Sequence, residues 1–260
     1  MVKLRKYNGF FIHFFSVFVF FLVLSCGCNQ YQNTKIEGKK IGVTAEYGEN
    51  KSVDAFVAPY RNHINKDMDV VLAYSPEIMD KSKGEWQTTI GNLMAEMTME
   101  MGNPVFAKRT GRNIDICLLN HGGIRAALPK GNITTRTAFE IMPFENSLIV
   151  VELKGAQIRE MAEYILKEKK PHPLTGLKII ADKNSLAIKT LLVNSQPVDN
   201  TKTYFVGTSD YLSNGGDKMD FFKKGIQSHD MEYKLRNLMI DYFKKTDTIP
   251  AITTERIVFE

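Results

Sequence analysis

Short apolar runs of strand length alternate with longer amphipathic segments along residues 41–259. Apolar residues at helical spacing predict helices over 52–67, capped by Ser52, and over 88–101, 135–141, 155–167 and 231–243. Strands are predicted over 41–47, 70–74, 114–119, 147–153, 177–181, 186–193, 203–208 and 256–259. Because strands and helices interleave, the chain is expected to form an α/β (α+β) fold in which a mixed β-sheet is layered with helices.

The N-terminal 28 residues have the pattern of an export signal. Lys3, Arg5 and Lys6 precede an apolar, Phe-rich run, Phe10–Leu24, which is shorter than the roughly 20 residues that span a bilayer. The Ser25-Cys26-Gly27-Cys28 segment that follows resembles a bacterial lipobox. We expect lipidation at Cys26, with Cys28 as the alternative site; a plain secretory signal or a short anchor helix is the other interpretation.

These features divide the chain into three parts. Residues 1–28 are predicted to be a lipoprotein signal peptide, 29–40 a polar tether, and 41–260 a single folded domain. The expected location is the bacterial cell envelope, with the exported lipoprotein anchored to the membrane and facing the periplasm.

The net charge and the cysteine content show what the body of the chain, after residue 28, is not expected to bind or form. Lys3, Arg5 and Lys6 supply three of the five net positive charges, so the body of the chain is nearly neutral and gives no electrostatic argument for binding nucleic acid. Cys117 is the one cysteine after residue 28, so the body has no intrachain disulfide. Its apolar neighbours predict a buried strand residue.

The motifs of several enzyme classes are missing from the sequence. The histidines of the body are scattered, with no His-x-His and no Cys pair, so no metal site is predicted in this chain. The Gly-x-Ser-x-Gly elbow, the Walker loop and the dinucleotide fingerprint are absent as well. No catalytic residue is therefore assigned.

Three loops carry the residues that could bind a ligand. Asn120-His121-Gly122-Gly123-Ile124-Arg125 follows a predicted buried strand, where paired glycines allow close backbone approach and an arginine can grip phosphate. Pro143-Phe144-Glu145-Asn146 precedes another strand, and Tyr211-Leu212-Ser213-Asn214-Gly215-Gly216-Asp217 follows a third. Each alone is commonly a turn. Together they offer an anion grip, two aromatic faces and an acceptor for a diol, which are the parts of a nucleotide site.

These three stretches, in this order, resemble the C-terminal domain of the 5′-nucleotidase family, with its Asn-x-Gly-Gly-x-Arg, Pro-Phe-Gly-Asn and Phe/Tyr-Leu-x-x-Gly-Gly-Asp motifs. Gly91-Asn92-Leu93 and the strand and helix from Leu148 to Ile158 also match. The resemblance covers roughly residues 41–259. It implies that Phe144 and Tyr211 sandwich the base, Asn146 meets the base edge, Asp217 accepts ribose hydroxyls and Arg125 meets phosphate. Asn120, Gly122 and Gly123 would shape the phosphate pocket.

The sequence departs from the family pattern at three places. Gly84-Glu85-Trp86-Gln87 lacks the arginine that family members carry before Gly-Asn-Leu, and Lys83 is a weak substitute. Glu145 replaces a glycine beside Phe144. His121 stands where a small residue is common, and packing or a solvent-facing role is favoured over a hydrogen bond to phosphate.

In the family, a separate N-terminal domain with two metals performs hydrolysis, and that domain is not expected in this chain. The resemblance therefore implies a recognition domain for nucleotides or nucleosides. It would act with a separate metallophosphatase chain, which would hold the divalent metals, to hydrolyse extracytoplasmic nucleotides. The alternative is a non-catalytic lipoprotein that binds nucleosides or nucleotides. Whether the chain alone is an enzyme stays open, and no cofactor of its own is expected.

Overall fold

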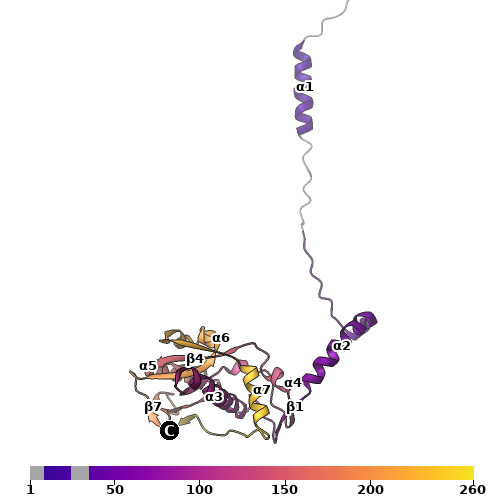
Figure 1. Ribbon diagram of the computed structural model, residues 1–260. Coiled ribbons are helices and arrows are strands. Elements are labelled where there is room, and N and C mark those ends of the chain that lie inside the picture. The colour runs from indigo at the N-terminus through magenta and orange to yellow at the C-terminus, as the bar shows by residue number, and fades with distance from the viewer. Residues whose placement is uncertain (1–8, 25–34) are drawn as a thin grey trace, which may run out of the picture. The chain divides into compact units, whose positions relative to one another are not determined.

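A computed structural model describes residues 9–24 and 35–260 of the chain (Figure 1). The predicted lipidation sites, Cys26 and Cys28, lie outside the described residues. The chain divides into two units at the boundary between Asp54 and Ala55. In the described ranges, no helix combines the length and the apolarity that crossing a membrane requires.

The helices are α1 (Gly9–Leu24), α2 (Lys51–Met68), α3 (Thr89–Thr110), α4 (Thr135–Ile141), α5 (Gly155–Glu168), α6 (Asp210–Ser213) and α7 (Leu235–Lys245). The strands are β1 (Val71–Ser75), β2 (Ile116–Leu118), β3 (Gly131–Thr134), β4 (Ser147–Lys154), β5 (Leu174–Thr175), β6 (Leu177–Ala181), β7 (Ile188–Val193), β8 (Gln196–Pro197), β9 (Thr203–Ser209), β10 (Ser228–Lys234) and β11 (Ile257–Phe259). Short 3-10 turns are η1 (Ala45–Tyr47), η2 (His121–Gly123), η3 (Gly216–Lys218) and η4 (Asp220–Lys224).

A mixed five-stranded sheet, in the order β10-β4-β9-β2-β5, forms the centre of the second unit. Only β2 and β9 run parallel in it. A four-stranded sheet, β11-β6-β7-β8, and the β1-β3 pair complete the strands of the described residues. The predicted α/β class with a mixed, helix-layered sheet is confirmed.

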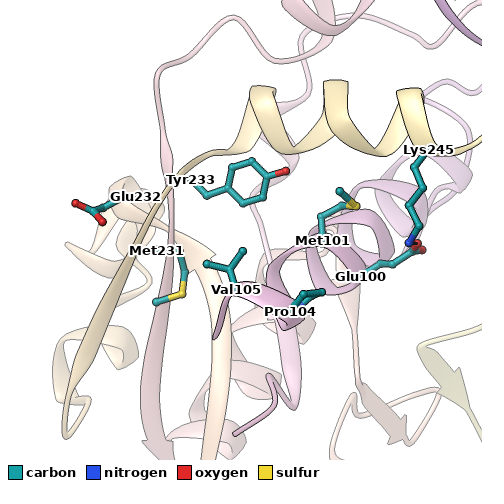
Figure 2. Close-up of a pocket in the computed structure, with 8 residues that line it drawn as sticks. All are labelled: Glu100, Met101, Pro104, Val105, Met231, Glu232, Tyr233 and Lys245. Carbon is teal, nitrogen blue, oxygen red and sulfur yellow. Dashed lines mark hydrogen bonds and ion pairs between the residues drawn. The ribbon is translucent and has the colours of Figure 1, made fainter. Parts of the chain in front are cut away.

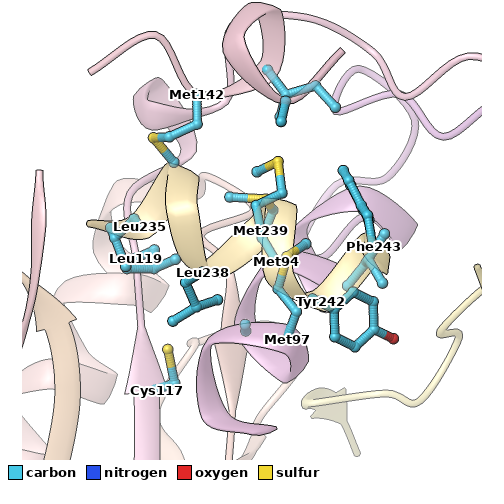
Figure 3. Packing of buried hydrophobic residues seen from close by; sticks show 14 of the residues in the cluster. Met94, Met97, Cys117, Leu119, Met142, Leu235, Leu238, Met239, Tyr242 and Phe243 are labelled. Carbon is cyan, nitrogen blue, oxygen red and sulfur yellow. The ribbon is translucent and has the colours of Figure 1, made fainter. Parts of the chain in front are cut away.

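The residues of β4 alternate between two hydrophobic cores, one on each face of the central sheet. Leu148 and Val150 face the core built with α3 and α7, whereas Ile149, Val151 and Leu153 face the core built with α5. This period of two is what a strand buried on both faces requires. Figure 3 shows the first core, in which Met94 and Met97 of α3 lie among the side chains of α7. Met94 and Met97 of the helix that was predicted over 88–101 therefore serve as core packing, and Cys117, predicted to be a buried strand residue, lies in the same core.

Residues 41–47 were predicted to be a strand, and this prediction is wrong. They have no strand structure, and only a 3-10 turn at Ala45–Tyr47 interrupts the extended chain. Val43 is 97% exposed. Alternation of apolar residues does not make a strand without a neighbouring strand to pair with its backbone.

Helix α2 begins with a different cap from the one expected. The Asn50 side-chain oxygen accepts the backbone N–H groups of Ser52 and Val53 at 3.1 and 3.3 Å, so Asn50 rather than Ser52 caps the helix. None of its residues is buried. From Ala55 onward its apolar stripe consists of Phe56, Val57, Tyr60 and Ile64, all exposed. Arg136 of α4 holds the helix end through Asp69 at 2.9 Å and Asn65 at 3.0 Å.

Two helix boundaries also differ from the prediction. Helix α3 continues past Met101 to Thr110, because apolar packing resumes at the fully buried Phe106. Residues 231–234 are the end of strand β10, and α7 begins only at Leu235. Met231 is buried whereas Glu232 is exposed, which fits a period of two. An apolar residue at 231 satisfies both the strand and the helix pattern, so the pattern alone could not place the boundary.

Candidate functional site

The sheet topology brings the three loops that were predicted to bind a ligand to one end of the central sheet. Strands β2 and β9 run parallel, so both end at the same end of the sheet. Strand β4 runs antiparallel to β9, and Leu148 pairs with Ser209, so β4 begins where β9 ends. The loops after β2, before β4 and after β9 must therefore meet.

A cavity of about 340 Å³ lies between these loops. Its lining consists of Asn120, Gly122, Gly123, Arg125, Phe144, Asn146, Tyr211 and Asp217. These are the eight residues that the sequence nominated for substrate binding, so the fold brings all of them together. The volume suits a small-molecule ligand of nucleotide size. That each residue contacts such a ligand stays a prediction.

A second hollow, of about 430 Å³, lies between α3, β10 and α7 (Figure 2). Met101, Pro104, Val105 and Met231 give it an apolar floor. Its charged groups are already paired at the rim: Lys245 lies 2.6 Å from Glu100, and Glu232 lies 3.1 Å from Arg109. Among the described residues that line this hollow, no set of polar groups converges to orient a small ligand.

The glycine loop after β2 is a single 3-10 turn. The Gly123 N–H donates to the Asn120 carbonyl at 3.0 Å. A Cβ at position 123 would lie 2.9 Å from the Asn120 side-chain oxygen, so glycine is needed there for the amide to fold over the turn. The turn delivers Arg125 to the cavity, where its guanidinium lies 5.9 Å from the centre of the Phe144 ring. Arg125 is exposed and can therefore reach an anion at the mouth of the cavity.

Two cations at the junction of β10 and α7 hold the Phe144 loop. Arg236 donates to the carbonyls of Met142 and Phe144 at 3.4 and 3.3 Å and forms an ion pair with Glu145. Lys234 donates to the Glu145 carbonyl at 2.7 Å. Glu145, which departs from the family pattern, therefore has a structural partner. Arg236 and Lys234 lie about 90 residues along the chain from this loop, so no local motif could have revealed them.

Tyr211 and Asp217 form a compact unit in the third loop. The Tyr211 hydroxyl donates to the Asp217 Oδ1 at 2.8 Å, and Asn120 donates to the Oδ2 at 2.8 Å. The Tyr211 ring lies over Gly216, where a Cβ would approach it to 2.5 Å. Tyr211 is 46% exposed and Phe144 is 40% exposed, so both rings have free surface at the cavity.

A pair of histidines lies behind the glycine loop. The His121 backbone N–H donates to Nδ1 of His172 at 3.2 Å, which requires that this nitrogen be unprotonated. Burial lowers the pKa of His172 to about 4, so the imidazole is neutral near pH 7. Burial also lowers the pKa of His121, whose side chain is hydrogen-bonded to the Pro171 backbone. The His121 side chain is thus partly buried at the loop; that it makes no hydrogen bond to phosphate stays a prediction.

The segment that lacks the family's arginine is used for packing. Trp86 lies against Phe259 with ring centres 4.9 Å apart, and the Gln87 side-chain oxygen accepts the Arg256 N–H at 2.6 Å. The cation that reaches the glycine loop is Lys81, not Lys83, because its Nζ donates to the Ile124 carbonyl at 2.6 Å.

Within residues 9–24 and 35–260, no group of three or more His, Cys, Asp or Glu side chains is arranged to hold a metal ion.

The fold and the site define a class of protein. It is an α/β domain in which three loops at one sheet end combine aromatic faces, a carboxylate and a guanidinium around a cavity. The chain belongs to the family described as 5′-nucleotidase, C-terminal domain, whose model matches residues 70–224, more than half of the chain.

Individual relatives agree with this assignment. The trifunctional nucleotide phosphoesterase protein YfkN of Bacillus subtilis is 24% identical over 213 residues, covering 76% of this chain and 14% of YfkN. The cell wall protein Lmo0130 of Listeria monocytogenes is 28% identical over 207 residues, covering 74% of this chain and 25% of Lmo0130. The crystal structure of a 5′-nucleotidase precursor from Thermus thermophilus matches with a TM-score of 0.66 at 25% identity, covering 80% of this chain and 42% of that one. The chain spans about a third or less of the curated relatives that it first matches.

Proposed function

We propose that this chain recognises nucleotides or nucleosides through the 340 Å³ cavity and contributes that recognition to a 5′-nucleotidase reaction. The convergence of all eight nominated residues on one cavity carries the proposal. The base stacks between the free faces of Phe144 and Tyr211, which exclude water from it. Asn146 donates to or accepts from the base edge.

The sugar and phosphate bind to the remaining polar groups. Asp217 accepts the ribose hydroxyls, and Arg125 donates to the phosphate oxygens from the mouth of the cavity. Asn120 and the two glycines shape the space beside the phosphate. The printed description of YfkN as a nucleotide phosphoesterase supports this ligand class.

Hydrolysis is proposed to require a separate metallophosphatase chain that docks over Arg125. The relatives are much longer than the region that this chain matches, which leaves room in them for a further domain. Activation of the attacking water is the chemistry that divalent metals supply in such a partner. The residues of this chain hold the nucleoside and orient the phosphate towards that partner.

The proposed location is the bacterial cell envelope, with the chain anchored by lipid at Cys26 or Cys28. The lipobox-like segment carries this proposal, and the name of the cell wall protein Lmo0130 is consistent with an envelope location. A second candidate function is capture of nucleosides without hydrolysis. It is favoured by the two aromatic rings and the polar groups that this chain itself brings to the cavity.

Titration calorimetry on the detergent-solubilised chain tests the proposal, with adenosine, guanosine, cytidine, uridine and the corresponding monophosphates as ligands. We expect binding without added metal, and loss of binding in the Phe144→Ala, Tyr211→Ala double variant. Failure of all eight ligands to bind would contradict the proposal that this chain recognises nucleotides or nucleosides.

Phosphate release from the monophosphates distinguishes the two candidate functions. The purified chain with added Mn²⁺ is expected to release none, and activity should appear when a metallophosphatase chain from the same organism is added. Release by the purified chain alone would contradict the need for a partner.

A further inference from the structure

Four hydrogen bonds within the protein hold Asp217, although this loop residue is exposed. Its carboxylate accepts from the Tyr211 hydroxyl at Oδ1 and from the Asn120 amide at Oδ2, both at 2.8 Å. Its N–H donates to the Tyr211 oxygen at 3.1 Å, and its carbonyl accepts from the Tyr164 hydroxyl at 2.7 Å. Its backbone has a φ of 52°, a left-handed conformation that these bonds maintain. Both the peptide and the carboxylate of Asp217 are thus fixed.

The two phenols are suited to this arrangement. The Tyr211 oxygen both donates to the carboxylate and accepts from the backbone of the same residue, so it clamps Asp217 at two points. Tyr164 belongs to α5, whose inner face is buried in a core, so it ties the loop to a rigid element. Burial raises the pKa of Tyr164 to about 12, and the hydrogen bond to Asp217 raises the pKa of Tyr211. Both hydroxyls therefore keep the protons that they donate.

The hydrogen bonds within the protein leave part of the Asp217 carboxylate free to accept hydrogen bonds from a ligand. An ionised carboxylate offers about four acceptor positions, two on each oxygen. One position on each oxygen of Asp217 is already occupied from within the protein. One free position then remains on each oxygen, with an orientation set by Tyr211 and Asn120. Two neighbouring hydroxyls, such as those of a ribose cis-diol, match this pair, whereas a 2′-deoxyribose leaves one position without a donor.

We propose that the hydroxyls of Tyr211 and Tyr164 are positioning groups that fix Asp217 for a cis-diol, so that the site selects ribonucleosides over 2′-deoxyribonucleosides. The inference rests on the proposed nucleoside-binding function and adds the sugar to it. Tyr211 thereby has two roles, because its ring supplies a face for the base and its hydroxyl sets the sugar acceptor. Tyr164 acts only through Asp217.

The experiment is titration calorimetry on the detergent-solubilised full chain with matched ribo- and 2′-deoxyribonucleosides of all four bases. For the wild-type chain we expect the ribonucleoside to bind about tenfold more tightly, the effect of one hydrogen bond to a charged group. Tyr211→Phe keeps the ring, so binding of the deoxynucleoside should change little. The preference for ribose should fall to about threefold or less, because the carboxylate can rotate. Tyr164→Phe should reduce the preference in the same direction.

A matched control is available among the residues that do not line the cavity. The Tyr233 hydroxyl also donates to an aspartate, Asp241, at 2.7 Å. Tyr233→Phe removes an equivalent hydrogen bond away from the cavity and should leave the ribose preference unchanged. Thermal melting of each variant confirms that the fold is retained.

The outcomes separate this inference from the function on which it rests. Equal affinity of the wild-type chain for ribo- and deoxynucleosides overturns the ribose selectivity while nucleoside binding stands. An unchanged preference in both Tyr211→Phe and Tyr164→Phe overturns the positioning role. Absence of nucleoside binding in the wild-type chain overturns the proposed function itself.

Discussion

At the scale of single residues, Arg125 is predicted to bind the phosphate of a nucleotide, because among the described residues it is the cation that lines the cavity. Arg125→Ala should weaken binding of a nucleoside monophosphate by about tenfold or more, since a guanidinium–phosphate contact is a charge-assisted hydrogen bond. Binding of the parent nucleoside should change little. Calorimetry with both ligands measures the difference, and Arg159→Ala on α5 serves as the control arginine. Equal weakening of both ligands would assign Arg125 to the shape of the pocket rather than to phosphate.

Arg236 is predicted to matter more for stability than its partner Glu145. The Arg236 side chain is 7% exposed, whereas that of Glu145 is 69% exposed. Arg236→Ala removes the donors to two loop carbonyls and a buried guanidinium that lies 4.1 Å from the Phe139 ring centre. We expect a loss of about 3 kcal/mol of unfolding free energy, because two loop carbonyls each lose a hydrogen bond from a charged donor. Glu145→Gln should cost under about 1 kcal/mol, because its charge faces solvent. Urea unfolding measures both, and a larger loss for Glu145→Gln would contradict this order.

At the scale of elements, α2 and α7 carry apolar stripes with opposite environments. Phe56 of α2 is 71% exposed, whereas Phe243 of α7 is fully buried in the first core. Phe243→Ala should cost about 3–5 kcal/mol of unfolding free energy, because it leaves a cavity. Phe56→Ala should change it by under about 0.5 kcal/mol, because most of that ring faces solvent and alanine favours helix. Chemical denaturation followed by circular dichroism tests the pair. A large loss for Phe56→Ala would show that α2 is packed in the folded chain.

The element scale also shows what the sequence could predict. The three site loops were found because each is a local motif directly beside a predicted strand, and those three strands do pair in the central sheet. Residues 41–47 and the 231–234 boundary were wrong because tertiary pairing, not local pattern, decides them. Arg236, Tyr164 and His172 support the loops from elements distant in sequence, so no spacing rule connects them to the motifs. Their roles follow only from the folded chain.

At the scale of the whole molecule, His172 links stability to pH. Its pKa is lowered from an ordinary value of 6.5 to about 4, chiefly by burial, whereas the unfolded chain keeps the ordinary value. Between these values the unfolded chain binds more protons, so the folded state loses stability as pH falls from 6.5 through 4. The loss attributable to His172 should reach about 3 kcal/mol, at about 1.4 kcal/mol for each unit of pKa shift. Above pH 6.5 this contribution is constant.

His172→Asn is the variant that isolates this effect. The asparagine oxygen can accept the His121 N–H in place of Nδ1 but does not titrate, so the glycine loop keeps its support. Urea unfolding at several pH values between 7 and 4 should show a steeper loss of stability for the wild-type chain than for the variant. Protonation of carboxylates lowers the stability of both proteins and cancels in the comparison. Parallel pH profiles would mean that His172 has the same pKa in the folded and unfolded chains. That result would contradict the inference that burial keeps the His172 imidazole neutral behind the glycine loop.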